Sequence, residues 1–237
     1  VWIAHGSGDA DREVVDERAM VQLPPDAPRY ALKRIWLSEE EESGYYYGFA
    51  NEALWPLCHQ APAQPVFRRT DWDQYRIVNE RFANAVAEEL DSDNPIVLVQ
   101  DYHLALVPGM LRELRSDVRI AHFTHTPFCG PNSIGVLPTD VAHAICGSMA
   151  AVASGFHCAR WARSYEASAR EVLGADAAIT GSFVASLGPD PGALTAAIES
   201  DEAQQAVAAL DDMVGDRKLL RRHCGQDERE AQAGSAG

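Results

Sequence analysis

The sequence predicts an α/β fold in which a parallel sheet is flanked by helices. Three runs with the composition of strands, residues 96–99, 119–124 and 151–156, alternate with segments that have the length and apolar spacing of helices. The first run is entirely apolar, as expected of a strand that is covered on both faces. Strands that alternate with helices in this way indicate βαβ units, so we expect a Rossmann-like sheet.

The segment that precedes these units contributes two further strands, residues 1–4 and 30–37. The first leads into a Gly-Ser-Gly turn at residues 6–8, whose backbone N–H groups either face a ligand or form an ordinary turn. Ser38 is followed by a run of glutamates that includes residues 39–41, which predicts a helix that begins with the Ser38 hydroxyl as its N-cap.

Several helices are expected in chain order. Residues 44–56 have a helical pattern with aromatic residues on more than one face, and Pro56 is expected to close this helix. Residues 71–90 form the clearest amphipathic helix. The helices of the βαβ units are expected to end near residue 115, to cover 140–150 and to cover 157–173.

The C-terminal part of the chain has a different texture. A turn rich in glycine and proline at 187–192 precedes an alanine-rich helix over 193–214. We therefore expect one domain over residues 1–186, a linker and helix over 187–220, and a disordered tail over 221–237 that lacks apolar periodicity.

Composition limits the classes of partner. The chain has 237 residues, of which 46% are hydrophobic and 23% are charged, as in a globular protein. Its 20 basic and 35 acidic residues give a net charge of −15, which argues against nucleic acid and anionic membranes but not against a small anionic substrate. No long apolar run or basic leader is visible. Five scattered cysteines without a Cys-x-x-Cys pair favour reduced thiols and a cytoplasmic location.

Polar residues follow two consecutive strands, and ligands bind beyond the carboxyl ends of such strands. Asp101 follows the first strand and His125 follows the second, so both are expected at one edge of the sheet. Each alone has an ordinary interpretation, a helix cap or a half-buried histidine, but the pair favours a site. Asp101, His103 and His125 do not have the spacing of a known metal site. Neither a Gly-x-Ser-x-Gly elbow nor a Gly-x-Gly-x-x-Gly fingerprint is present.

Aromatic residues gather in the helix expected over 44–56, including Tyr46 and Trp55. They either pack in the core or form a sugar site, where an aromatic face covers the C–H face of a pyranose. The pair Arg68 and Arg69 could supply charge to a phosphate or remain solvated at the surface.

Taken together, several segments resemble the trehalose-6-phosphate synthases, the retaining glycosyltransferases of family 20, which have two facing Rossmann domains (the GT-B fold). The resemblance runs from Val1 to about Leu220 and rests on short motifs that occur in the order and at the spacing of the family. They are Tyr-Tyr-Tyr-Gly-Phe-Ala-Asn-Glu-Ala-Leu-Trp-Pro at 45–56, Trp-Asp-Gln-Tyr-Arg-Ile-Val-Asn at 72–79, Val-Gln-Asp-Tyr-His-Leu at 99–104, His-Phe-Thr-His-Thr-Pro-Phe at 122–128, Leu-Pro at 137–138 and Gly-Phe-His at 155–157.

The resemblance implies an acceptor, glucose 6-phosphate, and a nucleotide-activated glucose donor, usually UDP-glucose. It implies that Tyr46 and Trp55 hold the sugar phosphate of the acceptor, that Asp101 hydrogen-bonds acceptor hydroxyls, and that His125 contacts the donor glucose near the reacting centre. It also implies that no cofactor, metal or protein nucleophile is needed. A homo-oligomer of a full-length protein is compatible with the resemblance.

The same comparison implies departures from the family. The chain starts after the first strand and glycine-rich loop of the family, and residues 221–237 match nothing in the donor domain, as if the reading frame had slipped. We therefore expect the acceptor-side half of the fold in residues 1–186 and an isolated chain that is inactive. A pseudo-glycosyltransferase with a cyclitol-type acceptor and a non-catalytic half-domain that binds a sugar phosphate remain as alternatives.

Overall fold

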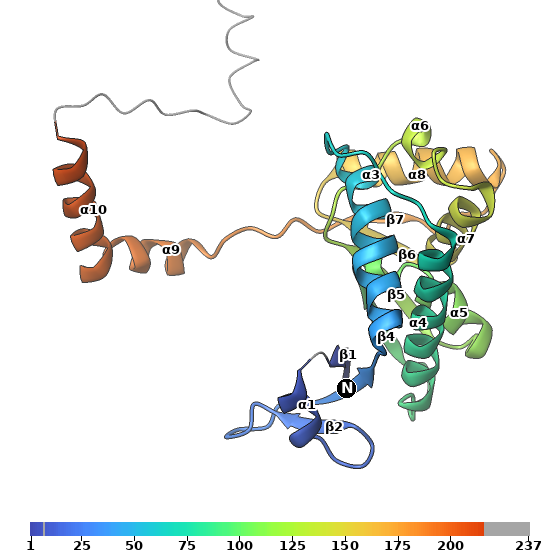
Figure 1. Cartoon of the computed structure of the whole chain (residues 1–237), viewed down its shortest axis with the longest axis horizontal. Helices are drawn as coiled ribbons and strands as arrows, with labels where there is room; N and C mark the ends of the chain where they lie inside the picture. The colour runs from blue at the N-terminus through green and yellow to red at the C-terminus, as the bar shows by residue number, and fades with distance from the viewer. Residues whose placement is uncertain (7, 216–237) are drawn as a thin grey trace, which may run out of the picture. The chain divides into compact units, whose positions relative to one another are not determined.

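The computed structural model describes residues 1–6 and 8–215, and its contacts divide the chain into two units, Val1–Ser186 and Leu187–Gly237 (Figure 1). The first unit contains all the strands found among the described residues. No helix in the described ranges is long and apolar enough to cross a membrane. The tail expected over 221–237 and the end of the linker expected over 187–220 lie outside the described residues.

The main sheet of the first unit has four strands in the order β4-β5-β6-β7, and every neighbouring pair is parallel. The predicted Rossmann-like sheet with flanking helices is thus confirmed, and the three predicted strands are its first three members. The fourth strand was not predicted. The strands are β4 Ile96–Gln100, β5 Arg119–Thr124, β6 Ala153–Phe156 and β7 Ser182–Val184.

Each pair of consecutive strands in this sheet is connected by one or more helices, as βαβ units require. The 3-10 helix η2 and α5 lie between β4 and β5, α6 and α7 lie between β5 and β6, and α8 lies between β6 and β7. The three helices expected in this region are confirmed to within a few residues. The bounds are η2 Tyr102–Leu104, α5 Val107–Leu114, α6 Pro131–Ile134, α7 Thr139–Ala150 and α8 Ala159–Leu173.

A smaller sheet of three strands precedes the main sheet in the sequence. β1 Trp2–Gly6 and β3 Tyr30–Trp36 were predicted and are parallel neighbours. β2 Met20–Leu23 pairs with β3 in the antiparallel direction, and the short helix α1 Asp9–Glu13 precedes it. These two elements were not predicted, because four or five residues are too few to show a period, and the pairing with β3 holds β2 in place.

The helices before the main sheet begin at the predicted cap. In α2 Glu39–Glu42, the Ser38 hydroxyl accepts the N–H of Glu41 over 3.1 Å, and the Glu41 carboxylate accepts the N–H of Ser38 over 2.7 Å. The chain continues as a π-helix, η1 Ser43–Leu54, and then as α3 Trp55–His59. The predicted end at Pro56 is wrong, because Pro56 occupies the first turn of α3, where its missing N–H needs no partner.

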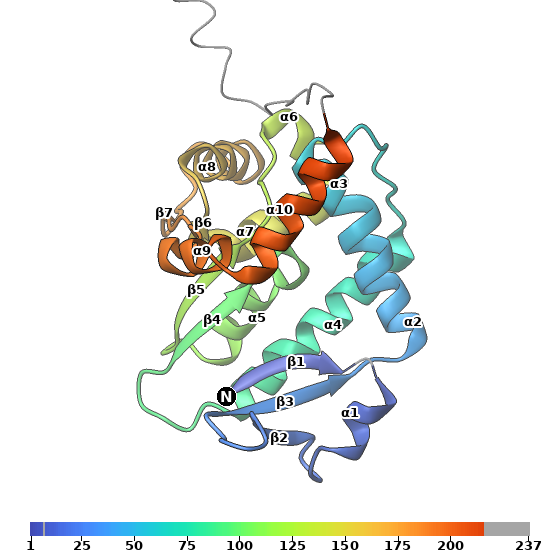
Figure 2. The ribbon, with the colours of Figure 1, turned by 90° about the vertical axis from the view of Figure 1, so that its left-hand side faces the viewer.

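The predicted amphipathic helix is confirmed as α4 Arg69–Glu88 and joins the two sheets. It contacts η1, α5 and the strands β1 and β3, and Figure 2 shows it running behind the smaller sheet. Its apolar face supplies Tyr75, Val78 and Phe82 to the core, where they are at most 4% exposed. Burial of this stripe fixes η1 and η2 relative to the edge of the main sheet.

The expectation that the strand at 96–99 is covered on both faces is wrong. Val99 is buried, but Ile96 and Leu98 on the opposite face of β4 are 63% and 67% exposed. β4 is the first strand of its sheet and pairs only with β5 among the described residues, so it does not occupy a central position. An apolar composition therefore did not identify which faces of the strand are covered.

The described part of the second unit, residues 187–215, contains two helices, α9 Pro191–Ile198 and α10 Asp201–Val214, where one helix over 193–214 was expected. Ser200 separates them, because its hydroxyl accepts the N–H of Ala203 over 3.2 Å and caps a new helix. The break was not predicted, because the alanine-rich composition favours helix on both sides of Ser200.

Candidate functional site

The carboxyl ends of β4 and β5 meet at one edge of the main sheet, where Asp101 and His125 lie. The main-chain N–H of His125 donates to Oδ1 of Asp101 over 3.1 Å, and the N–H of Tyr102 donates to the same oxygen over 3.0 Å. The predicted proximity of the two residues is therefore confirmed. It follows from the parallel pairing of the strands, in which Gln100 is opposite Phe123.

The backbone of Asp101 has φ 69° and ψ 168°, a region in which non-glycine residues are strained. Its N–H donates to the carbonyl of Phe123 over 2.7 Å, which extends the β4–β5 ladder by one residue. Its carbonyl accepts the N–H of Leu104 over 3.2 Å at the start of η2. The strained residue is thus held on both sides, and its carboxylate is fixed at the sheet edge.

A buried histidine, His122, contacts the main chain of Asp101. His122 is 0% exposed, and its Nε2 lies 3.0 Å from the Asp101 carbonyl oxygen. Because a carbonyl only accepts, Nε2 carries a proton. Burial lowers the pKa of His122, and this effect exceeds that of the hydrogen bond and charge of Asp101, which raise it. The sequence analysis gave His122 no role.

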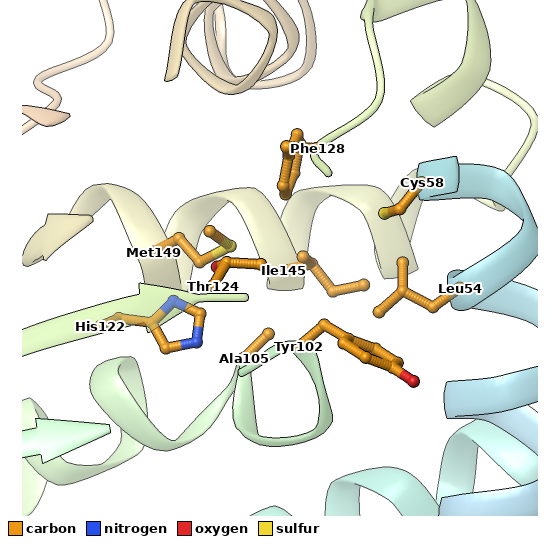
Figure 3. A pocket seen from close by; sticks show the side chains of 9 residues that line it. All are labelled: Leu54, Cys58, Tyr102, Ala105, His122, Thr124, Phe128, Ile145 and Met149. Carbon is orange, nitrogen blue, oxygen red and sulfur yellow. The ribbon is translucent and has the colours of Figure 1, made fainter. Parts of the chain in front are cut away.

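A small internal cavity of about 10 Å³ lies beside His122 (Figure 3). Nδ1 of His122 and Oγ1 of Thr124 are buried without a hydrogen-bond partner among the described residues. The cavity is too small for a substrate and belongs to the core behind the sheet edge. Its lining consists of Leu54, Cys58, Tyr102, Ala105, His122, Thr124, Phe128, Ile145 and Met149.

The ring of His125 has two polar partners at the sheet edge. Its Nε2 is 2.8 Å from Oε1 of Gln100, and its Nδ1 is 3.2 Å from Nε2 of His157. The ring of Phe123 packs edge-on against both imidazoles, with centroids 5.1 Å and 5.0 Å away. Gln100 and His157 had no role assigned from the sequence, although each stands directly at the end of a strand, which is the signal that identified Asp101 and His125.

Tyr46 is connected to the same edge of the sheet by its contact with His103, which lies two residues after Asp101. The two rings stack with centroids 5.1 Å apart and an interplanar angle of 12°. Burial lowers the pKa of His103, while the charge of Asp101 opposes this shift. Tyr102 ties η2 to η1, because its hydroxyl donates to Oδ1 of Asn51 over 2.8 Å. The π-helix therefore brings Tyr46 next to the residues that follow Asp101.

Trp55 lies at the start of α3 and is 41% exposed. Its ring stacks on His59 with centroids 4.0 Å apart. Within the described ranges its ring does not pack against Tyr46 or His125. The structure thus brings Asp101 and His125 together, places Tyr46 next to them, and leaves Trp55 on a neighbouring exposed surface.

The basic pair considered for phosphate binding forms surface ion pairs. Arg68 contacts Glu52 at 2.6 Å and Asp71 at 3.0 Å, and Arg69 contacts Asp140 at 2.6 Å. Both arginines already have carboxylate partners, which supports the surface alternative. Ser7 of the turn at 6–8 lies outside the described residues. No group of three or more potential metal ligands was found in residues 1–6 and 8–215.

The fold and the sheet edge define an α/β protein with the architecture of a GT-B glycosyltransferase domain. The chain belongs to glycosyltransferase family 20, whose family model matches residues 1–222. A solved α,α-trehalose-phosphate synthase (UDP-forming) from Burkholderia vietnamiensis superposes with a TM-score of 0.65 and 26% identity, over 80% of this chain and 43% of that one.

Two further relatives show the same similarity. Trehalose-6-phosphate synthase from Mycobacterium avium (strain 104) is 39% identical over 147 residues, which are 61% of this chain and 29% of the relative. The synthase from Burkholderia xenovorans in complex with glucose-6-phosphate has a TM-score of 0.62 and 23% identity, over 76% of this chain and 42% of that one. The chain thus spans less than half the length of these proteins.

Proposed function

We propose that this chain forms the acceptor-side half of a trehalose-6-phosphate synthase, in which residues 1–186 are the acceptor-side domain. The reaction transfers glucose from UDP-glucose to glucose 6-phosphate and yields trehalose 6-phosphate. The observation that carries the proposal is the hydrogen-bonded pair of Asp101 and His125 at adjacent strand ends, in a chain of family 20. The UDP-forming and glucose-6-phosphate-bound relatives support these substrates.

Asp101 is the proposed partner of acceptor hydroxyls. Oδ1 is occupied by two main-chain N–H groups, whereas Oδ2 accepts no hydrogen bond among the described residues. A carboxylate oxygen that is fixed in direction and free to accept suits a sugar hydroxyl, and such a charged hydrogen bond contributes about 1.5–3 kcal/mol. The strained backbone at residue 101 is consistent with a position that is kept for binding rather than stability.

His125 is the proposed contact of the donor glucose, and Tyr46 and Trp55 are the proposed contacts of the acceptor sugar phosphate. The His125 imidazole lies at the sheet edge with its Nε2 toward Gln100, where a sugar oxygen can receive the Nε2–H. Tyr46 and Trp55 offer an aromatic face and, in tyrosine, a hydroxyl. Among the described residues the ring of Trp55 stacks on His59 and not on Tyr46 or His125.

In the proposed reaction the anomeric hydroxyl of glucose 6-phosphate attacks C1 of the donor glucose. The bond between C1 and the diphosphate oxygen breaks, and the hydroxyl proton passes to the leaving diphosphate. Positive charge develops on the sugar and negative charge on the diphosphate, so catalysis depends on positioning and on the stabilisation of both charges. Asp101 and His125 serve the first requirement by orienting the two sugars.

Calorimetric titration of the full chain with glucose 6-phosphate tests the proposal. We expect saturable binding that glucose and inorganic phosphate do not reproduce at the same concentration. Loss of one charged hydrogen bond in Asp101→Ala corresponds to a loss of affinity of about tenfold or more. His143→Ala, an exposed change on α7, should bind as the parent chain does. A folded chain, verified by circular dichroism, that binds no glucose 6-phosphate would overturn the proposal.

A second arm follows UDP release in the presence of both substrates. Turnover would contradict the expectation from the sequence that this chain is inactive alone. Binding of glucose 6-phosphate without turnover is the outcome that the proposal expects of this chain alone.

A further inference from the structure

Three neighbouring strands each place one polar residue of a single hydrogen-bonded row at the sheet edge. Gln100 is the last residue of β4, and His125 and His157 directly follow β5 and β6. The row follows the strand order β4-β5-β6, with 2.8 Å from Gln100 Oε1 to His125 Nε2 and 3.2 Å from His125 Nδ1 to His157 Nε2. The parallel sheet therefore determines which residues are neighbours in the row.

The direction of both hydrogen bonds follows from one atom. Oε1 of Gln100 is an amide oxygen and only accepts, so Nε2 of His125 carries the proton. In a neutral imidazole Nδ1 is then the unprotonated nitrogen and must accept. His157 must in turn donate from its Nε2. Each ring in the row is thus assigned one tautomer.

The position of His157 is fixed from several sides. Its carbonyl accepts the hydroxyl of Ser186 over 2.7 Å, and its ring packs edge-on against Phe123 and Trp161, with centroids 5.0 Å and 6.2 Å away. Phe123 also packs edge-on against the ring of His125. Because these contacts fix the His157 ring, its Nε2–H has a fixed direction and can orient the ring of His125.

We propose that His157 is a positioning residue for His125: its N–H keeps Nδ1 of His125 as an acceptor, so that the N–H of His125 lies on Nε2 and is directed at Gln100. The consequence for catalysis rests on the proposed function. An oxygen of the donor sugar takes the place of the Gln100 amide oxygen as acceptor of the Nε2–H. His125 then enters the complex with its donor already formed and oriented, and only the exposed bond to Gln100 is exchanged.

Nitrogen-15 NMR of the histidine rings in the full chain tests this without substrate. A His125→Ala variant identifies the His125 signals. In the parent chain we expect a protonated Nε2, an unprotonated Nδ1 and an Nδ1 shift that reflects an accepted hydrogen bond. His157→Ala should move the Nδ1 signal to the position of a solvated imidazole and weaken the Nε2–H signal through exchange with water.

His157→Gln is the conservative variant, because its side-chain amide can donate to Nδ1 and should restore the parent signals. His143→Ala is the matched control, since His143 is exposed on α7 and away from the row. A protonated Nδ1 in the parent chain would overturn the inference, and so would His125 signals that His157→Ala leaves unchanged.

Titration of the same samples with glucose 6-phosphate and UDP-glucose separates this inference from the proposed function. Ring signals that respond to His157→Ala but to neither ligand would support the positioning role and contradict the synthase assignment. Ligand-induced shifts that are identical in the parent chain and in His157→Ala would support the assignment and contradict the positioning role.

Discussion

Nε2 of His122 lies 3.0 Å from the carbonyl oxygen of Asp101, a residue whose φ is 69°. A fully buried imidazole thus supports the strained peptide that presents the candidate carboxylate. The carbonyl has a second donor in the N–H of Leu104, and the carboxylate is held by two further N–H groups. Such over-determination is what allows a strained conformation to persist in a folded protein.

Replacement of Asp101 by alanine and by glycine should separate strain from binding. Both variants lose the carboxylate, but only glycine adopts φ 69° without a steric cost. We expect Asp101→Gly to be more stable than Asp101→Ala by about 1 kcal/mol, while both lose affinity for glucose 6-phosphate. Urea unfolding followed by circular dichroism measures the difference, and an alanine variant of equal or higher stability would exclude backbone strain at this position.

The stability of the chain should fall as the pH decreases below about 6.5, partly because of His122. Its pKa in the folded state is below the ordinary value of 6.5, so the unfolded chain binds a proton that the folded chain does not. This contribution is complete above pH 6.5 and is lost as the pH falls toward the lowered pKa. His103, whose pKa is also lowered by burial, acts in the same direction.

Unfolding free energies of the parent chain and of His122→Gln between pH 7.5 and 5 measure this effect, at values chosen to bracket the ordinary histidine pKa of about 6.5. Glutamine can still donate to the Asp101 carbonyl but does not titrate, so the variant should show a shallower pH dependence. His143→Gln, at an exposed position, should keep the slope of the parent chain. Equal slopes for all three would show that His122 does not contribute.

Tyr75→Phe should destabilise the chain by about 1–3 kcal/mol. The Tyr75 hydroxyl is fully buried, donates to the carbonyl of Tyr102 over 2.6 Å and accepts the N–H of Ala105 over 3.1 Å. Its removal leaves both main-chain groups unpaired at η2, just beyond Asp101. Thermal and urea unfolding measure the loss, and Tyr47→Phe, where the ring is 57% exposed, is the neutral comparison.

Ser38→Ala should cost about 1 kcal/mol, because it removes the acceptor of the Glu41 N–H at the start of α2. Ser116→Ala, at an exposed loop position, provides the reference for loss of a serine hydroxyl. Urea unfolding of the two variants under one set of conditions gives the difference. Equal stability of the two would mean that the capping box at Ser38 does not stabilise the fold.

The parallel sheet and its edge could be predicted because alternating strands and helices leave few arrangements. Once two consecutive strands are parallel neighbours, Asp101 and His125 must share an edge. The support from His122 could not be predicted in this way. Its partner is a main-chain carbonyl, which has no side-chain signature in the sequence, and its position inside a strand gives no sign that the ring is buried.

Three other differences between the predicted and the observed elements have identifiable causes. Pro56 was read as a helix end, although a proline in the first turn of a new helix is as favourable as one beyond the end. Ser200 divides the helix expected over 193–214, because a hydroxyl at an N-cap competes with continued helix even in an alanine-rich segment. The uncovered face of β4 depends on which elements pack over that strand, and this packing is set by tertiary structure.

The exposed Ile96 and Leu98 leave an apolar surface on β4, the first strand of the main sheet. A strand that has one ladder partner among the described residues and an exposed apolar face can pair with a second molecule, so we expect self-association along β4 at high protein concentration. Leu98→Lys should therefore reduce self-association, because a charge on that face opposes pairing with a second molecule and leaves the β4–β5 register unchanged.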